Sequence, residues 1–205
     1  MSLSFDLLPH KPLIIVISGP SGAGKDSVLH EMKKRNLPIH FVVTANTRPP
    51  RPNEKEGADY FFVSRERFEE MIANNELIEY SAVYKDYKGV PRAQVEKALQ
   101  SGKDVVMRLD VQGAKKMRKL YPQALLIFLI PANEEEWMER LKKRAGQAPA
   151  DLELRILKAQ EELLILPVFD YVVVNPQYKL SQAVDVVEAI LKAEHHRTSP
   201  RSASL

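Results

Sequence analysis

A run of glycines that ends in a lysine is the part of the sequence whose residue types could do chemistry most directly. The stretch Ser-Gly19-Pro-Ser-Gly-Ala-Gly24-Lys25 has the spacing Gly-x4-Gly-Lys of a phosphate-binding loop, or P-loop. Glycines let the backbone turn tightly, so that successive N–H groups and the positive end of the next helix surround phosphate oxygens. Lys25 would add a mobile positive charge beside the β and γ phosphates of ATP. We predict an ATP site formed by Gly19, Pro20, Ser21, Gly22, Ala23, Gly24, Lys25, Asp26 and Ser27.

The residue after this lysine departs from the usual pattern, because Asp26 stands where a P-loop commonly has Ser or Thr. A carboxylate is a hard oxygen ligand, and it could hold Mg²⁺ directly or through water. We therefore predict Asp26 as the metal-binding residue of the site. Without a compensating cation, however, this carboxylate would repel the neighbouring phosphates. The alternative interpretation of the whole segment from Gly19 to Lys25 is a glycine-rich turn between a strand and a helix that binds no ligand.

Composition limits the class of protein. With 205 residues, of which 44% are hydrophobic, the chain can bury a sizeable core as one domain. It has no cysteine, which excludes a disulfide framework and a cysteine-bearing zinc site. No segment approaches about 18 consecutive apolar residues, so we expect a cytoplasmic protein that does not bind membranes. The net charge of +3 is too small by itself to indicate nucleic-acid binding.

Alternating apolar segments predict the elements that must position the P-loop. Strands are expected at 13–17, 104–109, 125–130 and 171–174, and helices are expected at 26–35, at 92–101, after Gly113 and near the C-terminus. Alternation of strands and helices after an N-terminal P-loop indicates a three-layer α/β fold with a parallel sheet. Ligands of such folds bind at the carboxyl ends of the strands, so the P-loop and Asp110 should share one edge.

Two segments interrupt the alternation and divide the single domain that we expect at 13–192. Residues 40–91 read as a small, mostly β insertion, in which prolines stiffen a loop that carries Arg48 and Arg51. Residues 134–160 carry several arginines and read as two helices with a break near Gly146 and Pro149. The expected division is a lead-in at 1–12, a core at 13–39, 92–133 and 161–192, the two insertions, and a disordered tail at 193–205.

Several motifs in this order resemble the guanylate kinase family over about residues 13–192. They are Thr-Arg48-Pro-Pro-Arg51-Pro, Gly57-x-Asp59-Tyr60-Phe-Phe-Val, Glu79-Tyr80, Asp110-Val-Gln-Gly113 and Phe169-Asp-Tyr-Val-Val-Val-Asn175. The resemblance implies a P-loop kinase that transfers the γ-phosphoryl group of Mg-ATP to GMP or dGMP. It also implies that the β insertion is a GMP-binding subdomain and that the helical insertion is a lid. We expect ATP, GMP and Mg²⁺ as the ligands of a monomer or homodimer.

The resemblance assigns roles to individual residues. Arg48, Arg51 and Tyr60 correspond to the clamp on the GMP phosphate, and Thr44, Glu79 and Asp110 correspond to the residues that read guanine. Arg140, Arg144 and Arg155 correspond to lid arginines that act with Lys25 on the transferred phosphoryl, and Asn175 is expected at the ATP site. Independently of the family, the planar fork of arginine suits phosphate better than the point charge of lysine.

Three further positions depart from the family pattern. Lys88 and Val90 stand where many members have Tyr and Ser, and Arg108 stands where an acidic residue is common. Because residues i and i+2 of a strand share a face, Arg108 should point towards the nucleotides, as Asp110 does. We hypothesise that Lys88 contacts the acceptor phosphate and that Arg108 pairs with Asp26 across the P-loop. The alternative is that Arg108 only packs under the loop.

Two other functions are compatible with parts of the sequence. The P-loop segment Gly-Lys25-Asp-Ser is similar to that of ribose 1,5-bisphosphate kinases, which share the fold. The predicted guanine-reading residues argue against that activity. A catalytically inactive, guanylate-kinase-like module that binds proteins is the other alternative. The presence of Lys25, Arg144 and Arg155 argues against it, since such modules typically lack these residues.

Overall fold

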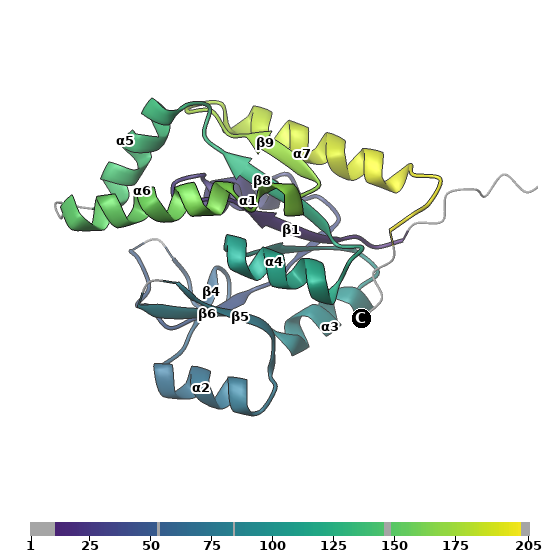
Figure 1. Cartoon of the computed structure of the whole chain (residues 1–205). Coiled ribbons are helices and arrows are strands. Elements are labelled where there is room, and N and C mark those ends of the chain that lie inside the picture. The colour runs from purple at the N-terminus through teal and green to yellow at the C-terminus, as the bar shows by residue number, and fades with distance from the viewer. Residues whose placement is uncertain (1–10, 53, 84, 146–148, 202–205) are drawn as a thin grey trace, which may run out of the picture.

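The computed structural model describes residues 11–52, 54–83, 85–145 and 149–201, and Figure 1 shows its arrangement. Its main sheet has five strands in the order β2-β7-β1-β8-β9, and every neighbouring pair is parallel. These strands are β1 (Ile14–Ser18), β2 (Ile39–Phe41), β7 (Asp104–Arg108), β8 (Leu125–Ile130) and β9 (Tyr171–Val174). The parallel α/β fold predicted from the sequence is confirmed, with four of these strands within one residue of their expected bounds.

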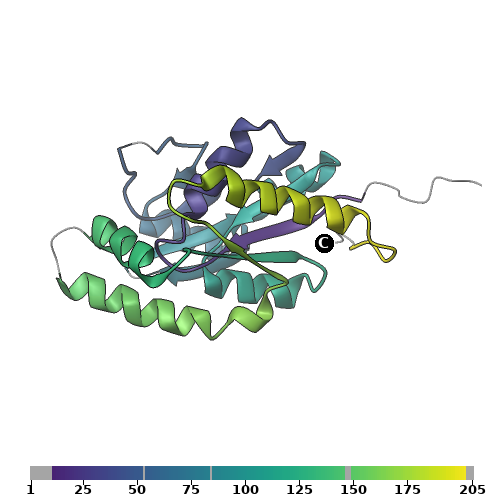
Figure 2. The same ribbon diagram turned by 90° about the horizontal axis from the view of Figure 1, so that it is seen from above.

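Helices cover both faces of this sheet, as Figures 1 and 2 show. On one face lie α1 (Lys25–Lys34) and α7 (Leu180–His195), and on the other lie α3 (Arg92–Gln100) and α4 (Val111–Leu120). Ile15 and Val28 belong to the apolar cluster of the first face, whereas Val16 and Met117 belong to that of the second. Since both faces of each central strand are buried, these strands are apolar without alternation.

A second, smaller sheet lies within the predicted β insertion. Its strands follow the order β4-β3-β6-β5, namely β3 (Thr44–Asn46), β4 (Tyr60–Phe62), β5 (Leu77–Val83) and β6 (Asp86–Pro91), and α2 (Arg65–Ala73) packs on it. The expected boundary at residue 40 was wrong by a few residues, because β2 pairs with β7 in the main sheet. Ile39 and Phe41 pack against the apolar cluster under α1, which holds this strand to the core.

Two helices form the predicted helical insertion and project from the same end of the molecule in Figures 1 and 2. They are α5 (Glu134–Ala145) and α6 (Pro149–Leu163), and a short 3-10 helix, η1 (Leu166–Val168), follows. The expected break near Pro149 is confirmed, because this proline is the first residue of α6, where its missing N–H costs nothing. Gly146 lies outside the described residues.

The described part of the C-terminal segment is folded, so the expectation of a disordered tail from residue 193 was wrong. Helix α7 continues to His195, and the Arg201 guanidinium forms ion pairs with Glu194 at 2.7 Å and with Asp170 at 3.3 Å. Opposite charges around a buried carboxylate hold the segment against the sheet. Residues 1–10 of the lead-in and 202–205 of the tail lie outside the described residues. Within the described ranges, no helix is long and apolar enough to span a bilayer.

Candidate active site

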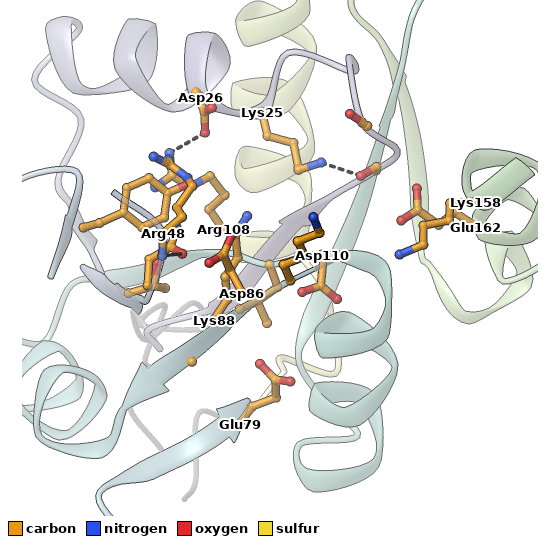
Figure 3. Close-up of a pocket in the computed structure, with 18 of the residues that line it drawn as sticks. Lys25, Asp26, Arg48, Glu79, Asp86, Lys88, Arg108, Asp110, Lys158 and Glu162 are labelled. Atoms are coloured by element: carbon orange, nitrogen blue, oxygen red, sulfur yellow. Dashed lines mark hydrogen bonds and ion pairs between the residues drawn. The ribbon is translucent and has the colours of Figure 1, made fainter. Parts of the chain in front are cut away.

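A cavity of about 560 Å³ lies at the carboxyl ends of β1 and β7, where Figure 3 shows its lining. The main sheet contributes P-loop residues and the end of β7, namely Gly19, Ser21, Lys25, Asp26, Arg108 and Asp110. The second sheet and its loops contribute Thr44, Arg48, Arg51, Tyr60, Glu79 and Lys88. Helix α6 closes one side with Lys158 and Glu162. Residues that the sequence predicted for two different nucleotides therefore face one space.

The P-loop has the geometry that its glycines predict. Gly24 has φ +87°, and a Cβ there would lie 2.3 Å from Asn175 Nδ2, so another residue would clash and strain the backbone. Asn175 donates from Nδ2 to the Ala23 carbonyl at 2.9 Å, so this side chain holds the P-loop in its conformation. Lys25 Nζ donates to the carbonyls of Gly19 and Pro20. Ser27, also predicted at the ATP site, is exposed on α1.

Helix α5 packs against the P-loop through two side chains. Trp137 donates from its indole Nε1 to the Ser21 carbonyl at 2.8 Å, and a Cβ at Gly22 would lie 3.3 Å from its ring. Arg140 donates to the Asn175 carbonyl at 2.9 Å, so it lies beside the loop. The side chains of Arg144 on α5 and Arg155 on α6 lie outside what the structure describes.

The hypothesis that Asp26 pairs with Arg108 is confirmed. Arg108 forms an ion pair with Asp26 Oδ1 and also donates from its second terminal nitrogen to the Asp59 carbonyl at 2.9 Å. Figure 3 shows the two side chains on the P-loop side of the cavity. Because a cation stands beside it, the unusual carboxylate of the P-loop is compensated.

A group of cations surrounds the ring of Tyr60, next to the ion pair of Arg108 with Asp26. The charged ends of Arg48 and Arg108 lie 5.0 and 4.1 Å from the ring centroid, and Lys88 Nζ lies 6.0 Å from it. Arg48 also forms two hydrogen bonds with the carboxylate of Glu54, at 2.6 and 2.5 Å. Burial lowers the pKa of Lys88 to about 8, and the nearby Lys25 and Arg108 add to this effect. Two of these three cations pair with carboxylates, Arg48 with Glu54 and Arg108 with Asp26.

Glu79 is a buried carboxylate at the opposite end of the cavity from the P-loop. Its side chain is 2% exposed, and among the described residues its Oε1 has no hydrogen-bond partner, although Lys116 Nζ lies 3.5 Å away. Burial raises its pKa to about 7, and the charge of Asp110 contributes to the shift. A Cβ at Gly113 would lie 2.9 Å from Glu79 Oε2, so the glycine leaves room for the carboxylate. A ligand with hydrogen-bond donors would satisfy this site.

Asp110 has a structural duty besides its place in the cavity. Its Oδ1 accepts from the backbone N–H groups of Gln112 and Gly113 at 2.9 and 3.0 Å, so it is the N-cap of α4. Its Oδ2 accepts from the hydroxyl of Ser81 on β5. The helix therefore begins at Val111, before the Gly113 start that the sequence suggested. Asp110 is fixed in place by two elements.

Comparisons with known proteins agree with this geometry. A sequence model described as Guanylate kinase matches residues 11–194. The chain is 42% identical over 198 residues to guanylate kinase 2, chloroplastic/mitochondrial, of Oryza sativa subsp. japonica, covering 96% of this chain and 70% of that protein. It is 41% identical to the guanylate kinase of Lactobacillus johnsonii, covering 93% of each. The chain belongs to the guanylate kinase family. The crystal structure of guanylate kinase from Anaplasma phagocytophilum is also similar, with a TM-score of 0.73, 31% identity and coverage of 94% and 91%.

Some residues of this guanylate kinase fold line the cavity without having been predicted from the sequence. Lys158 and Glu162 are four residues apart on α6, so they lie on one side of the helix and both face the cavity. Burial raises the pKa of Glu162 to about 7. The spacing of these two residues was visible in the sequence, but the expected end of the lid at residue 160 placed Glu162 in the core. Trp137 and Ser81 were missed because only their tertiary contacts reveal them.

Proposed function

We propose that the protein transfers the γ-phosphoryl group of ATP to GMP, and also to dGMP, giving GDP or dGDP and ADP. The buried Glu79 carries this proposal, because it lines the same cavity as the P-loop and its Oε1 accepts no hydrogen bond among the described residues, although Lys116 Nζ lies 3.5 Å away. Guanine presents its N1–H and its 2-amino group as donors along one edge, and Glu79 and Asp110 can accept from them. Adenine has an acceptor at N1 and no amino group at position 2. Binding adenine would leave buried acceptors without partners, at a cost of about 1–3 kcal/mol each.

The phosphate of GMP would bind among Arg48, Arg51, Tyr60 and Lys88, which line the cavity between the guanine end and the P-loop. The phosphates of ATP would bind at the P-loop, where Lys25 can leave its carbonyl partners for the β and γ phosphates. Phosphoryl transfer requires mainly alignment of the reacting groups and neutralisation of their charge in a closed site. Lys25 at the P-loop, and Arg48, Arg51 and Lys88 between the P-loop and the guanine end, would neutralise this charge.

The proposal includes a division of labour between the parts of the chain. The main sheet with its helices would bind ATP, the second sheet would bind GMP, and α5 with α6 would act as a lid. Arg140, Arg144 and Arg155 would then act with Lys25 on the transferred group as the lid closes. Arg140 of α5 already donates a hydrogen bond to the carbonyl of Asn175, the residue whose side chain bonds to the P-loop, and this contact is consistent with such closure.

The residues at the P-loop also fit the Mg²⁺ that kinases of this family generally use with ATP. Mg²⁺ is usually held by substrate phosphates and water with one or two carboxylates, and Asp26 supplies a carboxylate beside Lys25 at the cavity wall. The metal would neutralise charge on the β and γ phosphates when bound. Asp26 lines the cavity while it pairs with Arg108, and it could approach the metal directly or through a water.

A coupled assay of ADP release tests the proposal, with Mg-ATP and, in turn, GMP, dGMP, AMP, UMP and ribose 1,5-bisphosphate. We expect kcat/KM for GMP to exceed that for AMP by up to about 10⁴-fold, because the site is built on hydrogen bonds. We expect dGMP to react nearly as well as GMP. Equal values for AMP and GMP would contradict the guanine assignment. Activity with ribose 1,5-bisphosphate alone would support the other kinase, and GMP binding without turnover would indicate an inactive module.

Two properties of the proposed enzyme stay predictions. The cytoplasmic location is one, since the rice relative is named chloroplastic/mitochondrial while the other relatives cited are bacterial. The oligomeric state is the other, because a monomer and a homodimer are both compatible with one complete cavity in a single chain. Light scattering during size-exclusion chromatography would measure the mass of the particle in solution.

A further inference from the structure

Arg108 is the side chain that joins the P-loop helix to the second sheet. It ends β7, in register with Ile17 of β1, the strand that leads into the P-loop. One nitrogen of its guanidinium pairs with Asp26 in the first turn of α1, and another donates to the Asp59 carbonyl at 2.9 Å. Its charged centre also lies 4.1 Å from the Tyr60 ring centroid. A single planar group therefore contacts both the donor side and the acceptor side of the cavity.

The contacts of Arg108 are suited to fixing a distance. The Arg108 side chain is 12% exposed, so water has little access to the guanidinium, although Asp26 is 41% exposed. The guanidinium is rigid and planar, and its donors point in set directions, so Asp26 and Asp59 are held at a constant separation. Lys33 of α1 makes a second link to the same turn, donating to the Ala58 carbonyl at 3.1 Å, but its side chain lies outside the main cavity.

We infer that Arg108 is a positioning residue that sets the distance between the P-loop and the acceptor clamp at Tyr60. The inference rests on the proposed phosphoryl transfer between the two ends of the cavity. Reacting atoms must approach to about 3–3.5 Å, and a misplacement of about 1 Å can cost roughly 100-fold in rate. Arg108 reaches the reaction through Asp26 and Tyr60, so its loss should disturb turnover more than the binding of either nucleotide alone.

The test compares Arg108→Gln and Arg108→Lys with the parent protein. Turnover is measured with both substrates saturating, and the Kd values for GMP and for a non-hydrolysable ATP analogue are measured by calorimetry. We expect Arg108→Gln to lower kcat by about 10–100-fold while each Kd changes by less than about threefold. Arg108→Lys should keep the charge and the melting temperature but restore little of kcat, because an ammonium cannot span both partners. A parental kcat in Arg108→Gln would overturn the inference.

Two further variants separate positioning from simpler roles. Lys33→Met removes the other link to the turn, and we expect its kcat to stay within about twofold of the parent because Arg108 still bridges the two sides. An equal loss in Lys33→Met would mean that docking of the turn alone matters, which contradicts the inference. Asp26→Ser combined with Arg108→Gln tests whether Arg108 only neutralises Asp26. Recovery of the Asp26→Ser rate in the double variant would overturn the positioning role.

The proposed function is tested separately by the same measurements. If the parent protein does not phosphorylate GMP, the proposed function fails. If the parent is active and the Kd for GMP rises in Arg108→Gln in step with the loss of rate, only the positioning role fails, because Arg108 would then be a phosphate ligand. The two failures are therefore distinguishable from one set of data.

Discussion

At the scale of single residues, two side chains that line the cavity have shifted pKa values. Burial raises the pKa of Glu79 to about 7 and lowers that of Lys88 to about 8. Burial disfavours the charged form in both cases, so the acid holds its proton to a higher pH and the base loses its proton at a lower one. GMP binding, by our proposal, needs the ionised acid and the charged base. Both are present together only in a narrow range of pH.

We predict a bell-shaped pH dependence of kcat/KM for GMP. The value should rise as pH increases through about 7, because ionised Glu79 accepts from the guanine donors, and fall above about 8, because Lys88 loses its charge. Glu79→Gln should lower kcat/KM for GMP and reduce the preference for GMP over AMP. It should also remove the contribution of Glu79 to the acid limb of the pH profile. Lys88→Arg should move the alkaline limb to higher pH. Unchanged limbs in both variants would contradict these assignments.

At the scale of elements, the N-termini of α1 and α4 lie at the cavity, and α5 packs beside it. Helix α1 begins at the P-loop, and α4 begins at Asp110, whose carboxylate caps the helix and also bonds to Ser81 of the second sheet. Helix α5 packs against the loop through Trp137. Helix N-termini supply unpaired N–H groups, from which phosphates and carboxylates can both accept hydrogen bonds. The cavity therefore lies where α1 and α4 begin.

The two duties of Asp110 can be separated by substitution. Asp110→Asn should leave the free energy of unfolding unchanged, because Asn is as good an N-cap as Asp. By our proposal it should nevertheless raise KM for GMP and reduce the preference for GMP over AMP, because a charged acceptor for guanine is lost. Asp110→Ala should show the same loss of selectivity and also destabilise the fold by about 1 kcal/mol. Urea unfolding and the substrate assay measure the two effects. Equal stability of both variants would exclude the capping role.

At the scale of the whole molecule, the carboxyl ends and the amino ends of the strands in the main sheet carry different features. The carboxyl ends of the strands carry the cavity, and the opposite edge carries a network of ion pairs that holds the C-terminal segment. There, His195 lies 2.8 Å from Asp104 at the start of β7, and Arg201 pairs with Glu194 and Asp170. Glu194 is almost completely buried, with its side chain 1% exposed, and also accepts from the Tyr171 hydroxyl at 2.7 Å. The segment stabilises the domain at a distance from the chemistry.

We predict that Arg201→Gln lowers the free energy of unfolding by about 1–3 kcal/mol, because a buried carboxylate loses its closest cation. Its kcat should equal that of the parent, since Arg201 lies at the sheet edge opposite the cavity. Arg67→Gln is a matched control that breaks the exposed ion pairs of Arg67 with Glu70 and Glu76, and it should change stability by less than about 1 kcal/mol. Urea unfolding measures both. Parental stability of Arg201→Gln would mean that the ion pairs of Arg201 contribute nothing to the stability of the fold.

The sequence by itself determined the fold class, the P-loop and the family. These depend on short-range patterns: the apolar runs of strands buried on both faces, the spacing from Gly19 to Lys25, and motifs such as Asp110-Val-Gln-Gly113. The P-loop geometry follows from its own residues, because the positive φ at Gly24 and the close approach of Asn175 require glycine there. Such patterns are local in the sequence, so they can be recognised without knowing which residues are in contact in the folded chain.

Only the tertiary structure decided which charges face each other and at what burial. The sequence left Arg108 with two possible roles, and its contact with Asp26, 82 residues away, depends on how β7 lies beside β1. The burial of Glu79 and the ion pair between Glu194 and Arg201 likewise arise from the packing of elements in the folded chain. The energy of an ion pair or a buried carboxylate depends on distance and on exclusion of water. Neither quantity exists until the chain has folded, so residue order could not reveal it.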